Sequence, residues 1–476
     1  MRWHVVFLAL LLLAGAGPVS GAISGGRGPS STNISNMAGD SKRPAVAVGV
    51  DGSVHAVWED QSLGNWEIFY AFREAGGGWS PPANVSNNPG GSFRPAVAVG
   101  PDGSAHVVWH DDTPGDYEIF YAAKAPDGEW SAPVNISSSS AWSYWPSVAV
   151  GADASVYAAW HDDTPGNWEV LSAGRPPEGP WSPAANVSGS EGTSFVPRLL
   201  IAGDGSVHAV WQDDTSGTWE ILSASRLPQG SWSAAVNLSS TDGDSAPFSA
   251  TQSPDGSLHV VWREATSGGP RLLWAAKPPD GPWSAPQDID GPVSGSGAFS
   301  IGAGTDGSLH LVWEESALGN QDVFLGSRAP GGPWSSPLNL SNSPQESTLG
   351  GLAAGGDGAL HVVWRDGTPD KGDIFYWEGP AEPGSGGGAA PEGMKGVPLT
   401  LGCNLVTSSY PDSTAAETLA SAVSPAHAVL ALWKREGGDW LGYSPSYPRV
   451  SDLFRQDSQG LFFICTSGDA EFFMPL

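Results

Sequence analysis

Short apolar segments alternate with Gly-bearing turns along most of the chain, and this pattern predicts β-strands. In the first unit, the apolar segments Pro44–Val48 and Ser53–Trp58 are separated by an Asp-Gly pair, which favours the positive φ of a hairpin turn. Glu67–Phe72 forms the next segment, and a last one ends at the Asn-Val-Ser of residues 84–86. None of them has helical periodicity. We therefore predict four antiparallel strands per unit.

The unit repeats seven times without an insertion. A Trp closes the second segment of every copy, and successive copies of it are 51 residues apart, at Trp58, Trp109, Trp160, Trp211, Trp262, Trp313 and Trp364. Repeated four-stranded units of this length are typical of β-propeller blades. The predicted fold class is all-β, a seven-bladed propeller, in which these central tryptophans pack between blades.

The two ends of the repeat region predict how the ring closes. The seventh copy stops after Trp377, without the Trp-Ser and Asn-x-Ser elements of the other units. The sequence Asn33-Ile34-Ser35 lies 51 residues before the first complete Asn-x-Ser. We therefore expect residues 28–36 to supply the outer strand of the last blade, beside Ile374–Trp377.

The remaining segments divide the chain into four parts. Residues 1–22 carry Arg2, the apolar run Val5–Leu13 and small residues at 20–22, the pattern of a secretory signal peptide. Residues 23–379 are the predicted propeller, 380–396 a Gly- and Pro-rich linker, and 397–476 a small C-terminal α+β domain. We expect a secreted, monomeric protein without a membrane span, because no later apolar run is long enough to cross a bilayer.

In the C-terminal domain the pattern predicts strands at Leu401–Thr407, Val429–Lys434, Trp440–Tyr443 and Leu461–Thr466. A capping box at Thr414 predicts a short helix that ends near Val423. The only two cysteines, Cys403 and Cys465, lie in the first and last of these strands. In an oxidising compartment they are expected to form a disulfide.

Charge narrows the range of partners. The chain has 50 acidic and 21 basic residues, a formal net charge of −29. Nucleic acids and anionic membranes need a basic surface, so neither is an expected partner. The sequence lacks a phosphate-binding loop and the common hydrolase motifs, so we expect no cofactor and lean against an enzyme.

Three positions flank the loop between the second and third strands of each unit. A carboxylate follows the central Trp by two residues; in the first four units an aromatic residue and a second carboxylate follow it by eight and nine. The candidate ligand-binding residues are Asp60, Trp66, Glu67, Asp111, Tyr117, Glu118, Asp162, Trp168, Glu169, Asp213, Trp219 and Glu220. Either the carboxylates stitch the loop by accepting N–H bonds, or each ring stacks on a sugar whose hydroxyls meet the carboxylate.

Histidines also recur, three residues before the central Trp in six units. They are His55, His106, His208, His259, His310 and His361. Equivalent positions are spread around a ring and cannot converge on one ion, so we interpret them as structural and expect no metal. The pairs that His110 and His161 form with the following aspartates are a weaker metal candidate.

The repeats, with D-G-S-x-H-V-V-W followed by W-S-x-P-x-N-x-S, resemble sialidase-like propellers and bacterial seven-bladed fucose-binding lectins over about residues 28–379. The resemblance implies a propeller that binds a glycan or an extracellular protein. A sialidase-like exo-glycosidase is the alternative, for which Arg43, Arg94 and Arg198 could supply an arginine cluster, although the sialidase Asp-box is not matched. A structural surface protein is a further alternative.

The C-terminal segment is similar to a small module of secreted bacterial proteins that starts with G-W-N-L-V. Its internal W-x-x-Y-x-P is matched by Trp440, Tyr443 and Pro445, whereas Cys403 replaces the first Trp and Phe462–Cys465 replaces the aromatic ending. The resemblance suggests a role in attachment or sorting.

Overall fold

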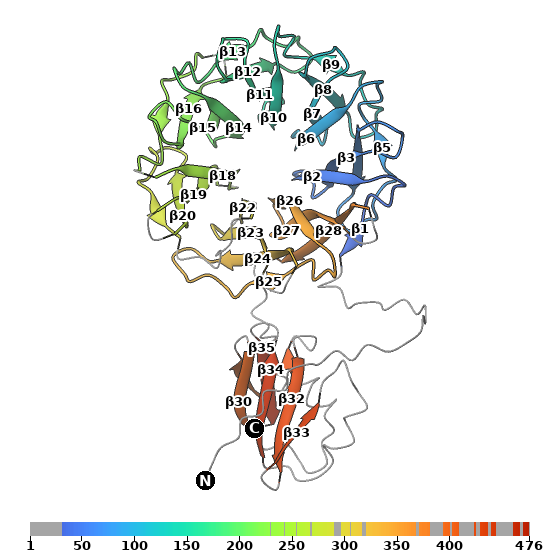
Figure 1. Cartoon of the computed structure of the whole chain (residues 1–476), viewed down its shortest axis with the longest axis vertical. Helices are drawn as coiled ribbons and strands as arrows, with labels where there is room; N and C mark the ends of the chain where they lie inside the picture. Colours follow the sequence, from blue (N-terminus) through green and yellow to red (C-terminus); the bar gives the residue numbers. More distant parts are fainter. Residues whose placement is uncertain are drawn as a thin grey trace.

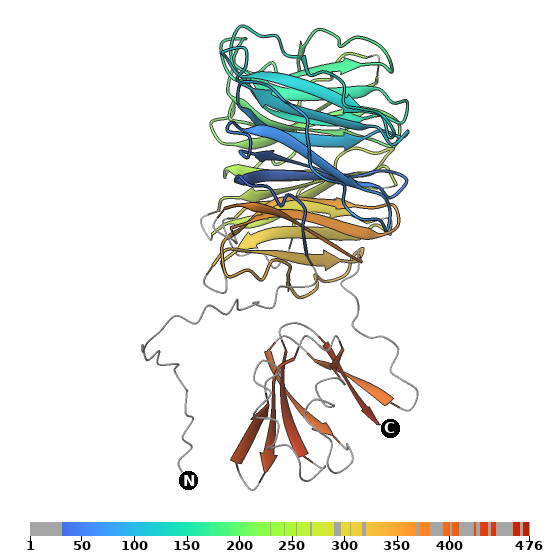
Figure 2. The same cartoon turned by 90° about the vertical axis from the view of Figure 1, so that its right-hand side faces the viewer.

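The computed structural model describes residues 31–380, with gaps at 229, 242, 254, 267–268, 290–296, 305, 317–319 and 368–370, and seven further strands beyond them. Seven four-stranded antiparallel sheets surround an axis (Figure 1). Seen from the side, their strands run from one face of the ring to the other (Figure 2). The seven-bladed all-β propeller predicted from the repeat is confirmed.

Each blade runs from an innermost to a short outermost strand, in chain order in blades one to six. Blades one to three comprise β2 (Ser41–Val48), β3 (Val54–Asp60), β4 (Glu67–Arg73), β5 (Ala83–Asn84); β6 (Ser92–Val99), β7 (Ala105–Asp111), β8 (Glu118–Lys124), β9 (Val134–Asn135); β10 (Ser143–Val150), β11 (Val156–Asp162), β12 (Glu169–Arg175) and β13 (Ala185–Asn186). Blades four to six comprise β14 (Ser194–Ile201), β15 (Val207–Asp213), β16 (Glu220–Arg226), β17 (Val236–Asn237); β18 (Ser245–Gln252), β19 (Leu258–Glu264), β20 (Arg271–Lys277), β21 (Gln287–Asp288); β22 (Phe299–Ala303), β23 (Leu309–Glu315), β24 (Asp322–Arg328) and β25 (Leu338–Asn339). Blade seven comprises β26 (Ser347–Ala354), β27 (Ala359–Asp366), β28 (Asp373–Pro380) and β1 (Thr32–Asn33).

The N-terminal strand closes the ring as the sequence predicts. β1 pairs with β28, with Thr32 opposite Tyr376 and Asn33 opposite Phe375. The Asn33 amide donates to the Asp373 carboxylate at 3.0 Å, and the Ile374 amide donates to the Ser35 hydroxyl at 2.8 Å. The last blade is therefore completed by residues more than three hundred positions away in sequence.

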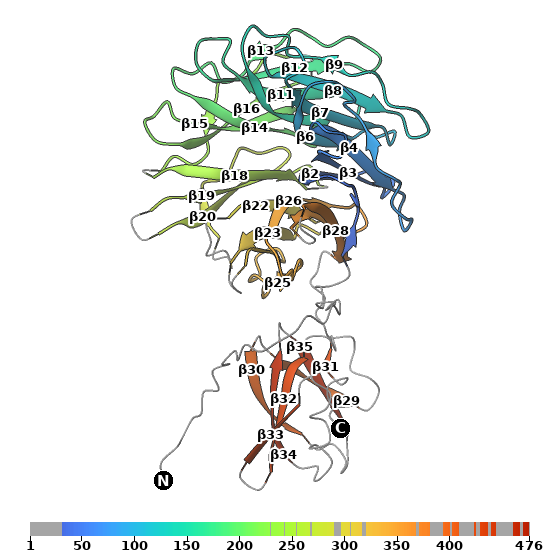
Figure 3. The ribbon, with the colours of Figure 1, turned by 45° about the vertical axis from the view of Figure 1, so that its right-hand side comes forward.

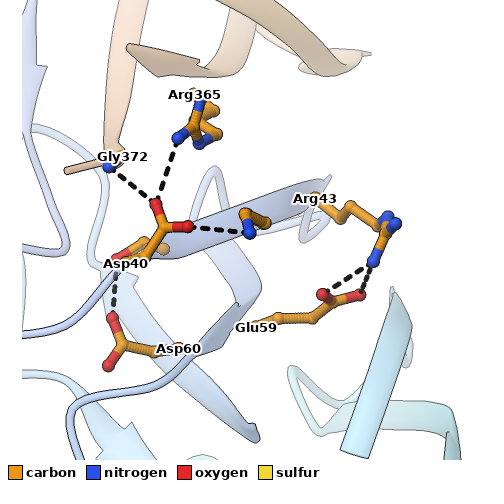
Figure 4. A network of polar contacts seen from close by, with 8 residues as sticks. Asp40, Arg43, Glu59, Asp60, Arg365 and Gly372 are labelled. Atoms are coloured by element: carbon orange, nitrogen blue, oxygen red, sulfur yellow. Dashed lines mark hydrogen bonds and ion pairs between the residues drawn. The ribbon is translucent and has the colours of Figure 1, made fainter. Parts of the chain in front are cut away.

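A second set of contacts joins blades seven and one at the inner strands. The Asp40 carboxylate accepts hydrogen bonds from the Gly372 amide at 2.7 Å and from the Arg365 guanidinium at 3.1 Å (Figure 4). The same carboxylate forms an ion pair with Lys42 at 2.8 Å. The seam is therefore held at both its inner and its outer edge.

The central tryptophans form the core between blades, as predicted. All seven are fully buried. Trp58 of β3 packs with Val363, Ile374 and Tyr376 of blade seven, and Trp211 of β15 packs with blade-three residues such as Val170. Each blade thus buries its Trp against the blade before it, and replacing one by Ala should cost about 3–5 kcal/mol.

The recurring histidines make hydrogen bonds inside the protein, most completely in blades one and two. In blade one, the Ser53 hydroxyl contacts Asp51 at 2.6 Å and His55 Nε2 at 2.9 Å, while His55 Nδ1 contacts the Tyr70 hydroxyl at 2.8 Å. Ser104, His106 and Tyr121 repeat this arrangement in blade two. These contacts give the histidines the structural role predicted for them.

The innermost strands of blades one to five and of blade seven contain a register shift near their start, which marks a β-bulge. In blades one to four the register shifts after the second residue of the strand, and the next residue has a positive φ: Arg43 (48°), Arg94 (50°), Trp145 (47°) and Val196 (52°). A positive φ is uncommon for residues other than glycine. Such bulges redirect side chains, here at the axial end of the strand.

The C-terminal strands form two further sheets, and Figure 3 labels them. They are β29 (Met394–Leu399), β30 (Gly402–Ser408), β31 (Val423–Ser424), β32 (Val429–Glu436), β33 (Asp439–Tyr443), β34 (Gly460–Thr466) and β35 (Ala470–Pro475). β30 pairs with β34 so that Cys403 lies directly opposite Cys465. This backbone register agrees with a cross-strand disulfide, and the bond itself stays a prediction.

Several sequence-based expectations fall outside the described residues. The predicted signal peptide, residues 1–22, and most of the helix predicted from Thr414 lie there. Val423, the expected end of that helix, belongs to β31. β29 begins at Met394, inside the predicted linker. No helix among the described residues has the length and apolar character needed to cross a membrane.

Removing residues 31–36 should destabilise the propeller strongly, because it exposes the edge of β28 and removes Ile34, a buried side chain that packs with Trp58 and Ile374. We expect a lower melting temperature by calorimetry and greater aggregation than in the intact chain. Leu63→Ala, at a side chain that is 60% exposed, is the control and should melt like the parent. A truncated protein of parental stability would contradict closure by β1.

Stability should also fall between pH 6.5 and 4, before most carboxylates titrate. Burial lowers the pKa of His55, His106, His208 and His310 to about 4, from the ordinary histidine value of about 6.5. The unfolded chain therefore binds more protons than the native state in this window, and each histidine removes up to about 1.4 kcal/mol per pH unit. Denaturant unfolding at several pH values measures the slope. The slope should be shallower in His310→Phe; identical slopes would contradict the assignment.

Candidate functional site

The first carboxylate of the predicted site is buried at the base of its loop. Asp162 accepts hydrogen bonds from the Ser143 hydroxyl at 2.7 Å, the Trp160 Nε1–H at 3.1 Å and the Thr164 amide at 2.8 Å. Its equivalents accept bonds from the hydroxyl that starts the innermost strand and from the amide two residues on: Asp60, Asp111 and Asp213. This carboxylate therefore joins the inner strand to the loop.

The second carboxylate explains the recurring Asn-x-Ser triplets. Glu67 accepts a hydrogen bond from the Ser86 hydroxyl, which itself accepts one from the Ile68 amide at 2.8 Å. Asn84 caps the next turn by accepting the Asn87 amide at 3.0 Å. The same serine–carboxylate pair recurs at Glu118, Glu169 and Glu220. The triplet thus ties the outer strand to the third strand.

Both carboxylate positions are buried and their hydrogen bonds are made within the protein, as the loop interpretation predicts. Burial raises the pKa of Glu118, with nearby Asp162 and Asp116 contributing. Contact between these carboxylates and a ligand stays a prediction. Their evident effect is to fix the loops that carry the aromatic residues.

The predicted aromatic residues of blades two to four lie in one continuous row, which includes four rings that the sequence analysis did not select. The row, which we refer to as the aromatic belt, consists of Phe93, Tyr117, Trp142, Tyr144, Trp168, Phe195 and Trp219. Neighbouring ring centroids are 5.0 to 6.1 Å apart. Trp142 is 48% exposed, and the other rings are partly exposed.

The belt alternates between two sources. Tyr117, Trp168 and Trp219 come from the loops between second and third strands, and Phe93, Tyr144 and Phe195 are the second residues of β6, β10 and β14. Tyr117 therefore contacts Tyr144 of the next blade at 5.0 Å, and Trp168 contacts Phe195 of the next at 5.7 Å. The belt crosses two blade boundaries on the face that carries these loops, which we call the loop face.

Trp66 of blade one contacts a lysine instead of an aromatic residue at the second position of its own innermost strand. Its ring lies 4.5 Å from the Lys42 ammonium, because Lys42 occupies the position that Phe93, Tyr144 and Phe195 have in the following blades. The sequence predicts equivalent sites in blades one to four, whereas the structure brings together the aromatic residues of blades two to four.

Two buried histidines form the floor of the belt. His110 contacts the rings of Phe93, Tyr117 and Tyr144, with centroids 5.1 to 5.8 Å away. His161 contacts Trp168 at 5.1 Å and Phe195 at 4.9 Å. Burial, and the nearby Arg94, lower the pKa of both histidines to about 3, so they are neutral at physiological pH. No group of metal-ligating side chains was found among the described residues.

Arginines lie at the axial side of the belt. The Arg94 guanidinium stacks over the Trp145 ring at 4.2 Å, and the Trp145 ring is 5.1 Å from His161. Arg43 forms an ion pair with Glu59 at 2.9 Å (Figure 4), and the Glu59 carboxylate also accepts the Arg94 backbone amide at 2.5 Å. The sequence analysis proposed Arg43, Arg94 and Arg198 as a possible arginine cluster. The charges of Arg43 and Arg198 both lower the pKa of Arg94.

A recess of 590 Å³ lies between the outer strands of blades two and three, lined in part by Tyr121, Arg175 and Trp181. The Trp181 ring meets Tyr121 edge-on at 5.0 Å. The same pair recurs as Trp130 with Tyr70 at 4.9 Å. This recurrence identifies the aromatic pair as part of the repeating packing between blades.

No protein-family model matches the chain, and a search of curated proteins finds no match. Solved structures with a similar fold include an ulvan lyase of polysaccharide lyase family PL25, bound to -[GlcA(1-4)Rha3S]- (8% identity, 74% of this chain, 96% of that chain, TM-score 0.53). A fungal alcohol oxidase of the AA5 family, in complex with copper, is also similar (11% identity, 95% of this chain, 100% of that chain, TM-score 0.52). A Hadza microbial sialidase, Hz136, has 13% identity, 72% and 66% coverage and a TM-score of 0.36. At these identities the likeness extends to the fold alone.

The stability effects of Asp162→Ala and Trp168→Ala should distinguish the buried carboxylates, which hold the loops in place, from the rings of the aromatic belt. Asp162→Ala leaves the buried Ser143 hydroxyl and Trp160 Nε1–H without this acceptor, together with the Thr164 amide, and should cost about 2–4 kcal/mol. Trp168→Ala removes a partly exposed ring and should cost no more than about 1 kcal/mol. Guanidinium unfolding measures both, with Trp160→Ala as the reference for a buried Trp. If Trp168→Ala were as destabilising as Trp160→Ala, the belt would be part of the core.

Proposed function

We propose that the protein is a carbohydrate-binding propeller and that the aromatic belt is its binding surface. The observation that carries the proposal is the continuous row of partly exposed rings across blades two to four. Aromatic rings offer the apolar face on which the C–H face of a sugar stacks, and they lose little conformational freedom on binding. A soluble protein rarely exposes so many rings together unless they contact a partner.

Polar groups at the edge of the belt complete the chemistry that a sugar needs. Trp142 donates its Nε1–H to Asp116 at 3.1 Å, and Asp163 accepts the Trp142 amide at 2.8 Å. Neither Asp116 nor Asp163 is buried, unlike the carboxylates that hold the loops in place. Both are therefore placed to accept hydrogen bonds from hydroxyl groups. A similar fold named for polysaccharide lyase activity is compatible with a carbohydrate ligand. With its predicted signal peptide, the protein would meet this glycan outside the cell.

A glycan array probed with the mature chain, followed by calorimetric titration of the best ligand, tests the proposal. Trp168→Ala should weaken binding by about 1–3 kcal/mol, the usual range for an aromatic residue at the centre of a binding surface. Trp66→Ala is the matched control, because it removes the equivalent ring of blade one, which lies beside Lys42. Its affinity should stay within about twofold of the parent.

Three outcomes would contradict the proposal. Equal losses in Trp66→Ala and Trp168→Ala would indicate separate sites on each blade instead of one belt. Binding that survives Trp168→Ala and Trp142→Ala together would place the ligand elsewhere. Turnover of a fluorogenic sialidase substrate, abolished by Arg43→Ala or Arg94→Ala, would favour the exo-glycosidase alternative.

A further inference from the structure

We infer that the axial end of the aromatic belt binds an acidic group of the carbohydrate, a carboxylate or a sulfate ester, between Arg94 of blade two and Arg198 of blade four. The inference rests on the proposed function and narrows its ligand to an anionic oligosaccharide. It is carried by the placement of these two arginines beside the belt and by the scarcity of acidic groups around them.

The two arginines differ from the other cations near the seam and the axis. In a chain with net charge −29, acidic partners are abundant, and Lys42, Arg43 and Arg365 all form ion pairs. Among the described residues, neither Arg94 nor Arg198 takes part in the ion pairs found. Arg94 is partly buried, and charged groups in such positions are normally paired, so its missing partner points to a ligand.

Arg198 stands out against the repeat. Arg198 lies in β14 and pairs with Val210 of β15. The residues at the same register in the other blades are all small: Ala45, Ala96, Ser147, Ser249, Ser300 and Gly351. Its side chain is exposed, whereas its neighbours Pro197 and Leu199 are buried. A long cation is therefore not needed for packing at this position of the innermost strands (Figure 1).

The charges around Arg94 leave room for an anion. Burial and the neighbouring charges of Arg43 and Arg198 together lower the pKa of Arg94 to about 10, and the Glu59 carboxylate opposes this shift. Glu59 is already bound by Arg43 through both carboxylate oxygens, at 2.9 and 3.1 Å. A bound carboxylate or sulfate would relieve this excess of positive charge.

The chemistry and position of Arg94 connect this charge to the belt. A guanidinium offers planar pairs of N–H donors that match carboxylate and sulfate oxygens. Arg94 lies on Trp145, Trp145 contacts His161, and His161 contacts Trp168 of the belt. One oligosaccharide can therefore stack on the belt and present an acidic group to the arginines.

The experiment compares oligosaccharides of equal length that are uronate-containing, sulfated or neutral, titrated against the full chain at low and high salt. The parent should bind at least one acidic series at least about tenfold more tightly than the neutral one, and high salt should weaken that preference. Arg94→Gln and Arg198→Ser should each reduce acidic-ligand affinity by about tenfold or more, the effect expected on losing a charged hydrogen bond. Affinity for the neutral series should change by less than about twofold.

Arg198→Ser introduces the residue that blades three, five and six already have at this register, so the fold should tolerate it. Arg94→Lys keeps the charge and should retain part of the acidic preference. Arg271→Gln, which removes an exposed arginine paired with Asp288 on an outer strand, is the control and should behave like the parent.

The outcomes separate this inference from the proposed function. Equal affinity for acidic and neutral oligosaccharides, with loss in Trp168→Ala, would overturn the acidic site and leave carbohydrate binding intact. Binding of inorganic sulfate without any acidic oligosaccharide would overturn the inferred ligand class. An absence of binding to every oligosaccharide would overturn both.

Discussion

Each blade buries its central tryptophan against the blade before it, so the first blade depends on the ring being closed. Trp58 has no earlier blade in the chain and packs instead against Val363 and Tyr376 of the last one. That contact exists only because β1 completes the seventh sheet and Asp40 binds Gly372 and Arg365 at its inner edge. A few residues near Thr32 and Asp40 therefore hold the ends of a fold built from more than three hundred residues.

The same repeat leaves the loop face free to vary. Two buried carboxylates per blade accept bonds from Ser hydroxyls and turn amides, and these bonds fix the loop between the second and third strands. The side chain at the position of Trp168 takes no part in these hydrogen bonds. The bulge in the innermost strands of blades one to four, where one residue has a positive φ, also redirects side chains near the start of the strand. Rigid loops then present whatever side chains stand at these positions.

The features set by the fold could be predicted from the sequence, because folding requires them in every blade. The Trp58 series, the Asp-Gly turns and the displaced Asn33-Ile34-Ser35 recur at 51-residue spacing, so the blade count and the closure follow from counting. The belt was only half predictable. Tyr117, Trp168 and Trp219 were selected as partners of carboxylates, but those carboxylates are buried and form hydrogen bonds within the protein. The partners of the rings are Phe93, Tyr144 and Phe195 of neighbouring strands, which contact them across blade boundaries that no local pattern reveals. Their own 51-residue spacing was the available signal.

The distribution of aromatic residues argues that the belt is there for something other than folding. At the position of Phe93, Tyr144 and Phe195, the other blades have Lys42, Ala246, Gly297 and Thr348. At the position of Trp168, blades five to seven have Pro270, Gln321 and Gly372. All seven blades bury the same core Trp, so the fold tolerates small, polar or charged residues at both positions. The other six blades have small residues at the register of Arg198, so the fold does not require an arginine there either. A requirement of folding would appear in every blade, whereas a requirement of one ligand is met on one side of the ring, where the rings and the arginines adjoin.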